Sequence, residues 1–155
     1  MMSTDATPVL RPAGPADIPA VAALTRAAYA KWVPLIGREP LPMLADFEAA
    51  VRDHRVELLF VGDALAGLVD LIPEEATLLV ESLAVAPEHQ GRGHGRRLMT
   101  RAEAIAAELG LARLRLYTNV AFAANVALYR TLGYAIDREE PFRGGLMVHM
   151  SKAAG

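Results

Sequence analysis

The sequence predicts an α/β fold in which a mixed sheet carries helices on both faces. Short apolar runs typical of strands alternate with segments of helical periodicity, hairpin turns join strands in the middle of the chain, and strand–helix–strand crossovers follow toward its end. The expected order is β-α-α-β-β-β-α-β-α-β-β. With 155 residues, 53% of them hydrophobic, the chain suits a single domain, which we expect over residues 8–153.

The first half of the chain is predicted to hold four strands and two helices. After a short strand at 9–11, a helix opens at Pro15 and places apolar residues at helical spacing through Ala28. Residues 31–42 contain three prolines and one glycine, so we expect them to be irregular. A second helix fits Leu44, Phe47 and Val51. Three strands joined by tight turns then follow, at 56–61, 64–72 and 76–85.

The second half alternates helices with strands. A long amphipathic helix is predicted over 96–109, with Gly110 as its stop. A strand at 111–118 alternates leucine with arginine, and a helix over 122–132 ends at Gly133. Two closing strands are expected at 134–138 and 146–151.

Composition excludes several classes of function. A net charge of −2 argues against nucleic acid as a partner. The absence of cysteine excludes disulfides, a cysteine-ligated zinc site and a cysteinyl acyl-enzyme. The four histidines lack metal-ligand spacing, so we expect surface histidines and no metal. Residues 1–8 do not resemble a signal peptide and no apolar run reaches the roughly 18 residues of a membrane span, so we expect a cytoplasmic protein with no membrane partner.

A glycine-rich turn, Gln90-Gly91-Arg92-Gly93-His94-Gly95, connects the strand ending at Val85 to the long helix. Unpaired N–H groups and the helix dipole make such a place suitable for a phosphate. The glycines do not match the dinucleotide motif, and the Gly-Lys-Ser/Thr of nucleoside-triphosphate loops is absent. The remaining pattern, Gln-x-x-Gly-x-Gly after Leu-Ala-Val-x-Pro, resembles the coenzyme A pyrophosphate turn of the GNAT superfamily of N-acetyltransferases.

A second motif, about thirty residues further on, strengthens this resemblance. It reads Asn125-x-x-Leu128-Tyr129-Arg130-x-Leu132-Gly133-Tyr134 and is similar to the family's Asn-x-x-Ala-x-x-Leu-Tyr-x-x-x-Gly-Phe/Tyr element, with the first half compressed. The resemblance implies a GNAT-type, mostly antiparallel sheet of about seven strands that splays apart between strands 4 and 5. It also implies acetyl-CoA as co-substrate, with the following binding residues: Leu83, Ala84, Val85, Gln90, Gly91, Arg92, Gly93, His94, Gly95, Arg96, Asn125 and Tyr129.

The chemistry of acetyl transfer assigns three catalytic roles. In the family, the splay frees main-chain groups beside the acetyl group, so the Val85 N–H is our candidate for stabilising the oxyanion. Glu81 interrupts an apolar strand four residues earlier, which predicts that both side chains share a face and that Glu81 is the base; Asp70 and Glu57 are alternatives. Tyr129 is the candidate acid for the leaving thiolate. Without cysteine we expect direct attack in a ternary complex, and Ser82 shows no base partner.

The acceptor is not named by the sequence. By resemblance, the first two helices and their connection cover the acceptor side, and Tyr29, Trp32, Met43, Phe47 and Glu81 are the expected contacts. An aromatic and acidic wall would suit the primary amine of a small molecule. Two alternatives remain open: a protein or peptide N-acetyltransferase, and a non-catalytic acyl-CoA-binding module. The resemblance also suggests a homodimer.

Overall fold

The computed structural model describes residues 7–154, which form one seven-stranded sheet with the order β1-β2-β3-β4-β5-β7-β6. Within these residues β4–β5 is the one parallel pair, and the other neighbouring pairs are antiparallel. The predicted mixed, mostly antiparallel sheet is therefore confirmed. The strands are β1 (Val9–Pro12), β2 (Arg55–Val61), β3 (Ala64–Pro73), β4 (Thr77–Val85), β5 (Arg113–Asn119), β6 (Ala135–Phe142) and β7 (Gly145–Ala153).

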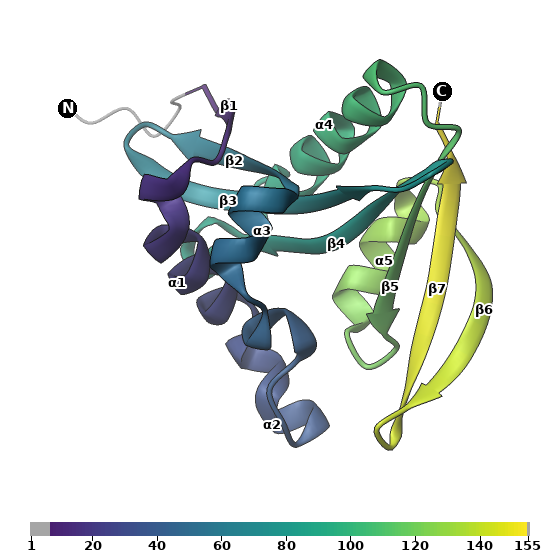
Figure 1. Ribbon diagram of the computed structural model, residues 1–155. Helices are drawn as coiled ribbons and strands as arrows, with labels where there is room; N and C mark the ends of the chain where they lie inside the picture. The colour runs from purple at the N-terminus through teal and green to yellow at the C-terminus, as the bar shows by residue number, and fades with distance from the viewer. Residues whose placement is uncertain (1–6, 155) are drawn as a thin grey trace.

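Helices cover both faces of the sheet, as predicted (Figure 1). On one face, α4 (His94–Glu108) and α5 (Ala123–Thr131) pack on strands β3, β4, β5 and β7 around a core that includes Leu71, Leu98 and Leu116. On the other face, α1 (Ile18–Tyr29) and α3 (Phe47–Asp53) pack on β2 and β3 around Leu24 and Leu58. The central strands are apolar on both sides because both of their faces are buried.

The strands β4 and β5 stay paired over only four residues and then separate. Their register runs from Thr77 opposite Arg113 to Val80 opposite Leu116. Beyond Val80, β4 remains bonded to β3 while β5 continues along β7, so the two halves of the sheet diverge (Figure 1). At the closed end, Arg115 of β5 donates two hydrogen bonds to Glu74, in the β3–β4 turn. This splay confirms the predicted opening between strands 4 and 5.

The connection between the first two long helices differs from its prediction. Residues 31–42 are not irregular: they contribute to two 3₁₀ turns, Ala30–Trp32 (η2) and Leu41–Leu44 (η3), and contain a single helical turn, α2 (Val33–Ile36). A proline inside a helix breaks it, but Pro34 lies in the first turn of α2, where its missing N–H costs nothing. Gly37 ends α2 in the left-handed conformation, at φ +74°. The next helix, α3, begins only after Asp46, whose side chain accepts from the Ala49 N–H.

The sixth strand, β6, is longer than the predicted 134–138. Its side chains are mostly exposed and lack the apolar alternation that marks a half-buried strand, so the sequence gives no signal for its second half. It reaches Phe142 and turns into β7 through Arg143 and Gly144, which both have positive φ, as a two-residue hairpin of type I′ requires. No helix in the described part of the chain is long and apolar enough to cross a membrane. The expectation that residues 1–8 are not a signal peptide falls mostly on residues 1–6, which lie outside the described residues.

Candidate active site

The end of β4 that faces the splay presents main-chain groups to a cavity rather than to a strand. The Ala86 N–H donates to the Ala66 carbonyl at 2.8 Å, and hydrogen-bonded pairs alternate along an antiparallel ladder. Ala84 therefore bonds β3, whereas Leu83 and Val85 point their groups into the splay. The Leu83 carbonyl accepts from the Tyr29 hydroxyl at 2.9 Å, and the Val85 carbonyl accepts from Gln90 Nε2 at 3.1 Å. The two N–H groups remain available to a ligand.

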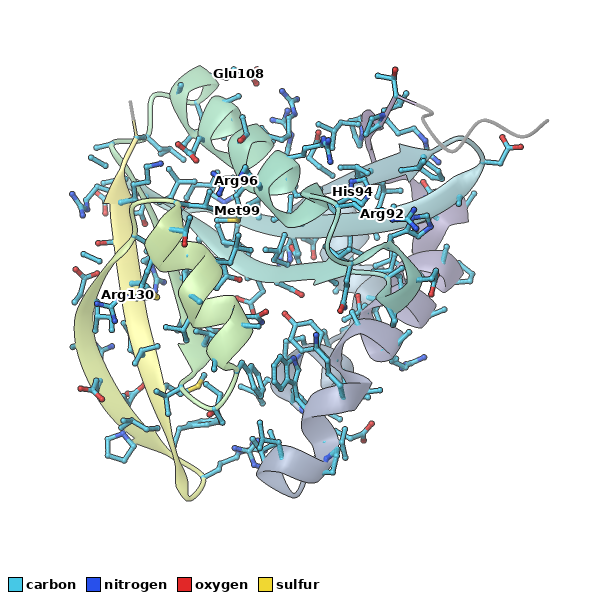
Figure 2. The ribbon with its side chains drawn as sticks, turned by 180° about the vertical axis from the view of Figure 1, so that it is seen from behind. Arg92, His94, Arg96, Met99, Glu108 and Arg130 are labelled. Atoms are coloured by element: carbon cyan, nitrogen blue, oxygen red, sulfur yellow. The ribbon has the colours of Figure 1, made fainter. Side chains whose placement is uncertain are left out.

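The glycine turn lies beside this edge and begins α4. Gly91 and Gly93 have φ values of +79° and +82°, which only glycine adopts without strain. Arg97, one turn into α4, donates to the Arg92 carbonyl at 2.7 Å and so fastens the turn to its own helix. Figure 2 shows Arg92 and His94 at the start of α4 and Glu108 near its opposite end. The N–H groups of the first turn, with the positive end of the helix dipole, are suited to bind an anion.

His94 is buried, so the expectation of a surface histidine is wrong at this position. Its Nδ1 lies 3.1 Å from Arg97 Nη1. A guanidinium can only donate, which places the proton of the neutral ring on Nε2. Burial and the neighbouring Arg97 lower the pKa of His94, so the ring is neutral near pH 7. The sequence offered no signal for this burial beyond the position at the start of an amphipathic helix.

A cavity of about 440 Å³, here the larger cavity, lies between the β4 edge, the glycine turn, α5 and the end of α1. Arg96 and Lys31 give it positive charge, and a Cβ at Gly91 would meet nothing within 4 Å. These features fit the diphosphate of coenzyme A. Of the predicted cofactor residues, Arg92 and Tyr129 are not among its lining. Those that line it are Leu83, Ala84, Val85, Gln90, Gly91, Gly93, His94, Gly95, Arg96 and Asn125.

A second cavity of about 60 Å³, here the smaller cavity, adjoins the first. Tyr29 and Leu83 line both, so the two meet at the open edge of β4. Glu81 and Tyr129 line the smaller cavity. Of the remaining residues expected at the acceptor, Trp32 lines the larger cavity and stacks on Phe122 at a centroid distance of 4.8 Å. Met43 and Phe47 line neither cavity and pack against the α1–β2 core.

A β-bulge determines where Glu81 points. Ser82 pairs with Asp70 and Val80 with Leu71, so Glu81 is an extra residue on β4. Val85 packs on the α4 side of the sheet, whereas Glu81 accepts from the Tyr117 hydroxyl on the opposite face. The expectation that both side chains share a face is therefore wrong, because the extra residue shifts the alternation. Burial raises the pKa of Glu81, and the hydrogen bond from Tyr117 partly offsets that rise.

Tyr117 and Tyr129 also line the smaller cavity, and of these two phenols Tyr117 is the one that donates a hydrogen bond to Glu81. Burial raises the pKa of Tyr129 well above its usual value, and burial together with Glu81 raises that of Tyr117 to about 12. Both hydroxyls therefore stay protonated at neutral pH. Sequence reasoning gave no role to Tyr117 or to Arg38, which also lines the smaller cavity. The sequence could have indicated Tyr117, because its place in the alternating strand puts it on the face opposite the core leucines. It contains no comparable signal for Arg38.

The comparisons with known proteins identify the class. The model of the acetyltransferase (GNAT) family matches residues 21–134, and the chain belongs to that family. It is thus an acetyltransferase, and the resemblance seen in the two sequence motifs is confirmed. A search of curated proteins found no significant match.

Solved structures share the fold at low sequence identity. The PaiA N-acetyltransferase of Thermoplasma acidophilum, in complex with coenzyme A, is 16% identical, with a TM-score of 0.82 over 95% of this chain and 99% of that one. A nourseothricin acetyltransferase is 25% identical, with a TM-score of 0.74 over 96% and 99%. The Escherichia coli ribosomal-protein-S18-alanine N-acetyltransferase is 18% identical, with a TM-score of 0.75 over 96% and 94%.

Proposed function

We propose that this chain, as a single domain over residues 8–153, transfers an acetyl group from acetyl-CoA to the primary amine of a small molecule. The observation that carries the proposal is the meeting of the two cavities at Leu83 and Tyr29. One cavity has the glycine turn and positive charge, and the other has the half-buried carboxylate of Glu81. A volume of about 60 Å³ for the smaller cavity suits a small acceptor better than a folded protein surface.

The residues divide the work along the β4 edge. The N–H groups of the glycine turn, with Arg96, hold the diphosphate, and Asn125 lies along the same cavity. Bound acetyl-CoA supplies an activated thioester carbonyl. The Val85 N–H is positioned on the open edge to donate to the oxygen of that carbonyl, a contribution of about 3 kcal/mol to the barrier.

Glu81 and Tyr129 handle the protons. An alkyl amine has a pKa of about 10, so it must lose a proton before it attacks. Glu81 accepts this proton in the smaller cavity, where its raised pKa makes it a better base than an exposed carboxylate. Tyr129 lines the same cavity and keeps its proton at neutral pH, which suits it to protonate the departing thiolate.

A thiol-release assay against a panel of amines tests the proposal, after calorimetry has confirmed uptake of acetyl-CoA. We expect release with small primary amines. Release with peptide N-termini alone would assign the chain to the protein N-acetyltransferases. Uptake of acetyl-CoA without release for any amine would make it a binding module.

A further inference from the structure

The smaller cavity has two charged residues in its lining, and they have opposite signs. Glu81 enters from the bulge in β4, and Arg38 enters from the segment between α2 and η3. The other lining residues are apolar, aromatic or uncharged, including Phe122, Phe142 and Thr118. The cavity therefore presents a carboxylate and a guanidinium to one small ligand.

Arg38 differs from the arginines that stabilise the fold. Arg115 and Arg101 bind Glu74 and Glu57 at 2.6 and 3.0 Å. In the described part of the chain Arg38 has no carboxylate within 4.0 Å, and its guanidinium carbon lies 5.8 Å from the centroid of the Phe142 ring. Its fork of N–H donors is thus held against an aromatic wall without an anionic partner.

A positive charge in a partly apolar cavity favours a ligand that neutralises it. A simple amine would satisfy Glu81 and leave Arg38 unpaired, at a cost in desolvation free energy. A carboxylate matches the planar guanidinium and accepts two parallel hydrogen bonds from it. A ligand that carries both an amine and a carboxylate would pair with both residues at once.

We propose that the acceptor is a small zwitterion of the amino acid class, and that Arg38 binds its carboxylate while Glu81 receives the proton of its amine. This inference rests on the proposed function and adds a substrate class to it. It also separates a free amino acid from a peptide N-terminus, because a peptide N-terminus has an amide where the free amino acid has a carboxylate.

The test compares α-, β- and ω-amino acids with their own carboxamides in the thiol-release assay. We expect kcat/KM for at least one free acid to exceed that of its carboxamide by about 10- to 100-fold, the usual effect of a hydrogen bond to a charged group. In Arg38→Gln this ratio should fall to about one, chiefly through a higher KM for the free acid. Arg38→Lys keeps the charge without the fork and should give an intermediate ratio.

Arg52→Gln is the matched control. Arg52 is exposed on α3, pairs with Asp53 and lines neither cavity, so the ratio should stay as in the unmodified protein. Equal turnover of acids and carboxamides would overturn the inference while leaving the proposed function intact, as would a ratio that survives Arg38→Gln in a protein with an unchanged melting temperature. Failure to acetylate any amine would instead remove the proposed function.

Discussion

The carboxylate of Glu81 balances two opposing influences. Burial disfavours its charged form and raises its pKa, while the Tyr117 hydroxyl, 3.2 Å from both carboxylate oxygens, donates to the charged form and lowers it. If Glu81 is the base, Glu81→Gln keeps the shape of the side chain but removes the proton acceptor. We expect turnover to fall by about 10²-fold or more, measured as thiol release at saturating acetyl-CoA. Unchanged turnover would pass the role to another group, such as Asp70.

A change at Tyr117 should alter the pH dependence of the reaction. Tyr117→Phe removes the donor to the charged carboxylate, so the pKa of Glu81 rises further above its ordinary value. The base must be ionised to act, and the acidic limb of the kcat/KM profile should therefore move to higher pH. The profile is measured with one acceptor across the acidic and neutral range. A limb that stays in place, or moves to lower pH, would contradict the coupling.

Tyr129 has a natural comparison in Tyr134. The two rings lie 6.0 Å apart and both are buried, but only Tyr129 lines the smaller cavity. We expect Tyr129→Phe to lower turnover by about 10²-fold without changing acetyl-CoA affinity, since Tyr129 does not line the larger cavity. Tyr134→Phe should leave turnover unchanged, because it removes a buried hydroxyl that has no hydrogen-bond partner in the described residues. Equal effects in both variants would indicate a packing role for Tyr129.

At the scale of elements, the proposed coenzyme A binding depends on the left-handed backbone of the glycine turn. Gly91→Ala forces a side chain into left-handed backbone, at a cost of about 1–2 kcal/mol. We expect it to weaken coenzyme A binding, measured by calorimetry, by about 10-fold or more, the loss of one charge-assisted hydrogen bond. Gly110→Ala has a similar φ of +70° and equally open space beyond the far end of α4. Gly110→Ala should lower the stability to a similar extent without weakening coenzyme A binding. An equal loss of coenzyme A affinity in both variants would contradict an anion site at the turn.

An element was predictable from the sequence where local signals determine it, and not where pairing with distant residues does. The long helix α4 and the turn before it were predictable because their period and glycines are local signals. The mostly antiparallel character of the sheet and its splay are implied by the resemblance, whereas the spatial order of the strands was not predicted. The sequence does not predict the helical turn α2, because a proline such as Pro34 is as common at the start of a helix as at a break. It predicts only part of β6, because an exposed edge strand has no apolar alternation. The bulge at Glu81 is a property of pairing with β3, which no single strand encodes.

The candidate site was predictable to the extent that it lies on motifs. All turn residues except Arg92 line the larger cavity, and Tyr129 lines the smaller one. Their positions follow from α4, which the turn begins, and from α5, because both helices are packed on the sheet. Arg38 comes from a short connecting segment brought over β4 by tertiary packing, so its position has no local signature. The resemblance places Met43 and Phe47 at the acceptor because the first two helices and their connection cover that side. Their apolar and aromatic side chains pack against the core instead.

For the whole molecule, an ion pair with a buried carboxylate joins α4 to β2. Glu57 of β2 is 1% exposed and accepts from Arg101 Nε at 3.0 Å, while Arg55 Nε lies 3.7 Å away. Arg101→Met leaves this carboxylate without its main partner, and we expect the free energy of unfolding to fall by about 3 kcal/mol. The double variant Glu57→Met with Arg101→Met should recover most of it. Urea unfolding measures both, and a single variant as stable as the unmodified protein would contradict the assignment.

The one-residue bulge in β4 has a consequence for how this enzyme can diverge. Excising residue 81 would let β3 and β4 pair in an uninterrupted ladder, with the glycine turn and its anion site in place. A descendant with that single-codon deletion would keep its architecture and the proposed binding site for the thioester donor, but would lose the proposed base. A single deletion at this position would thus remove the same proposed proton acceptor as Glu81→Gln, and would in addition regularise the pairing of the two strands.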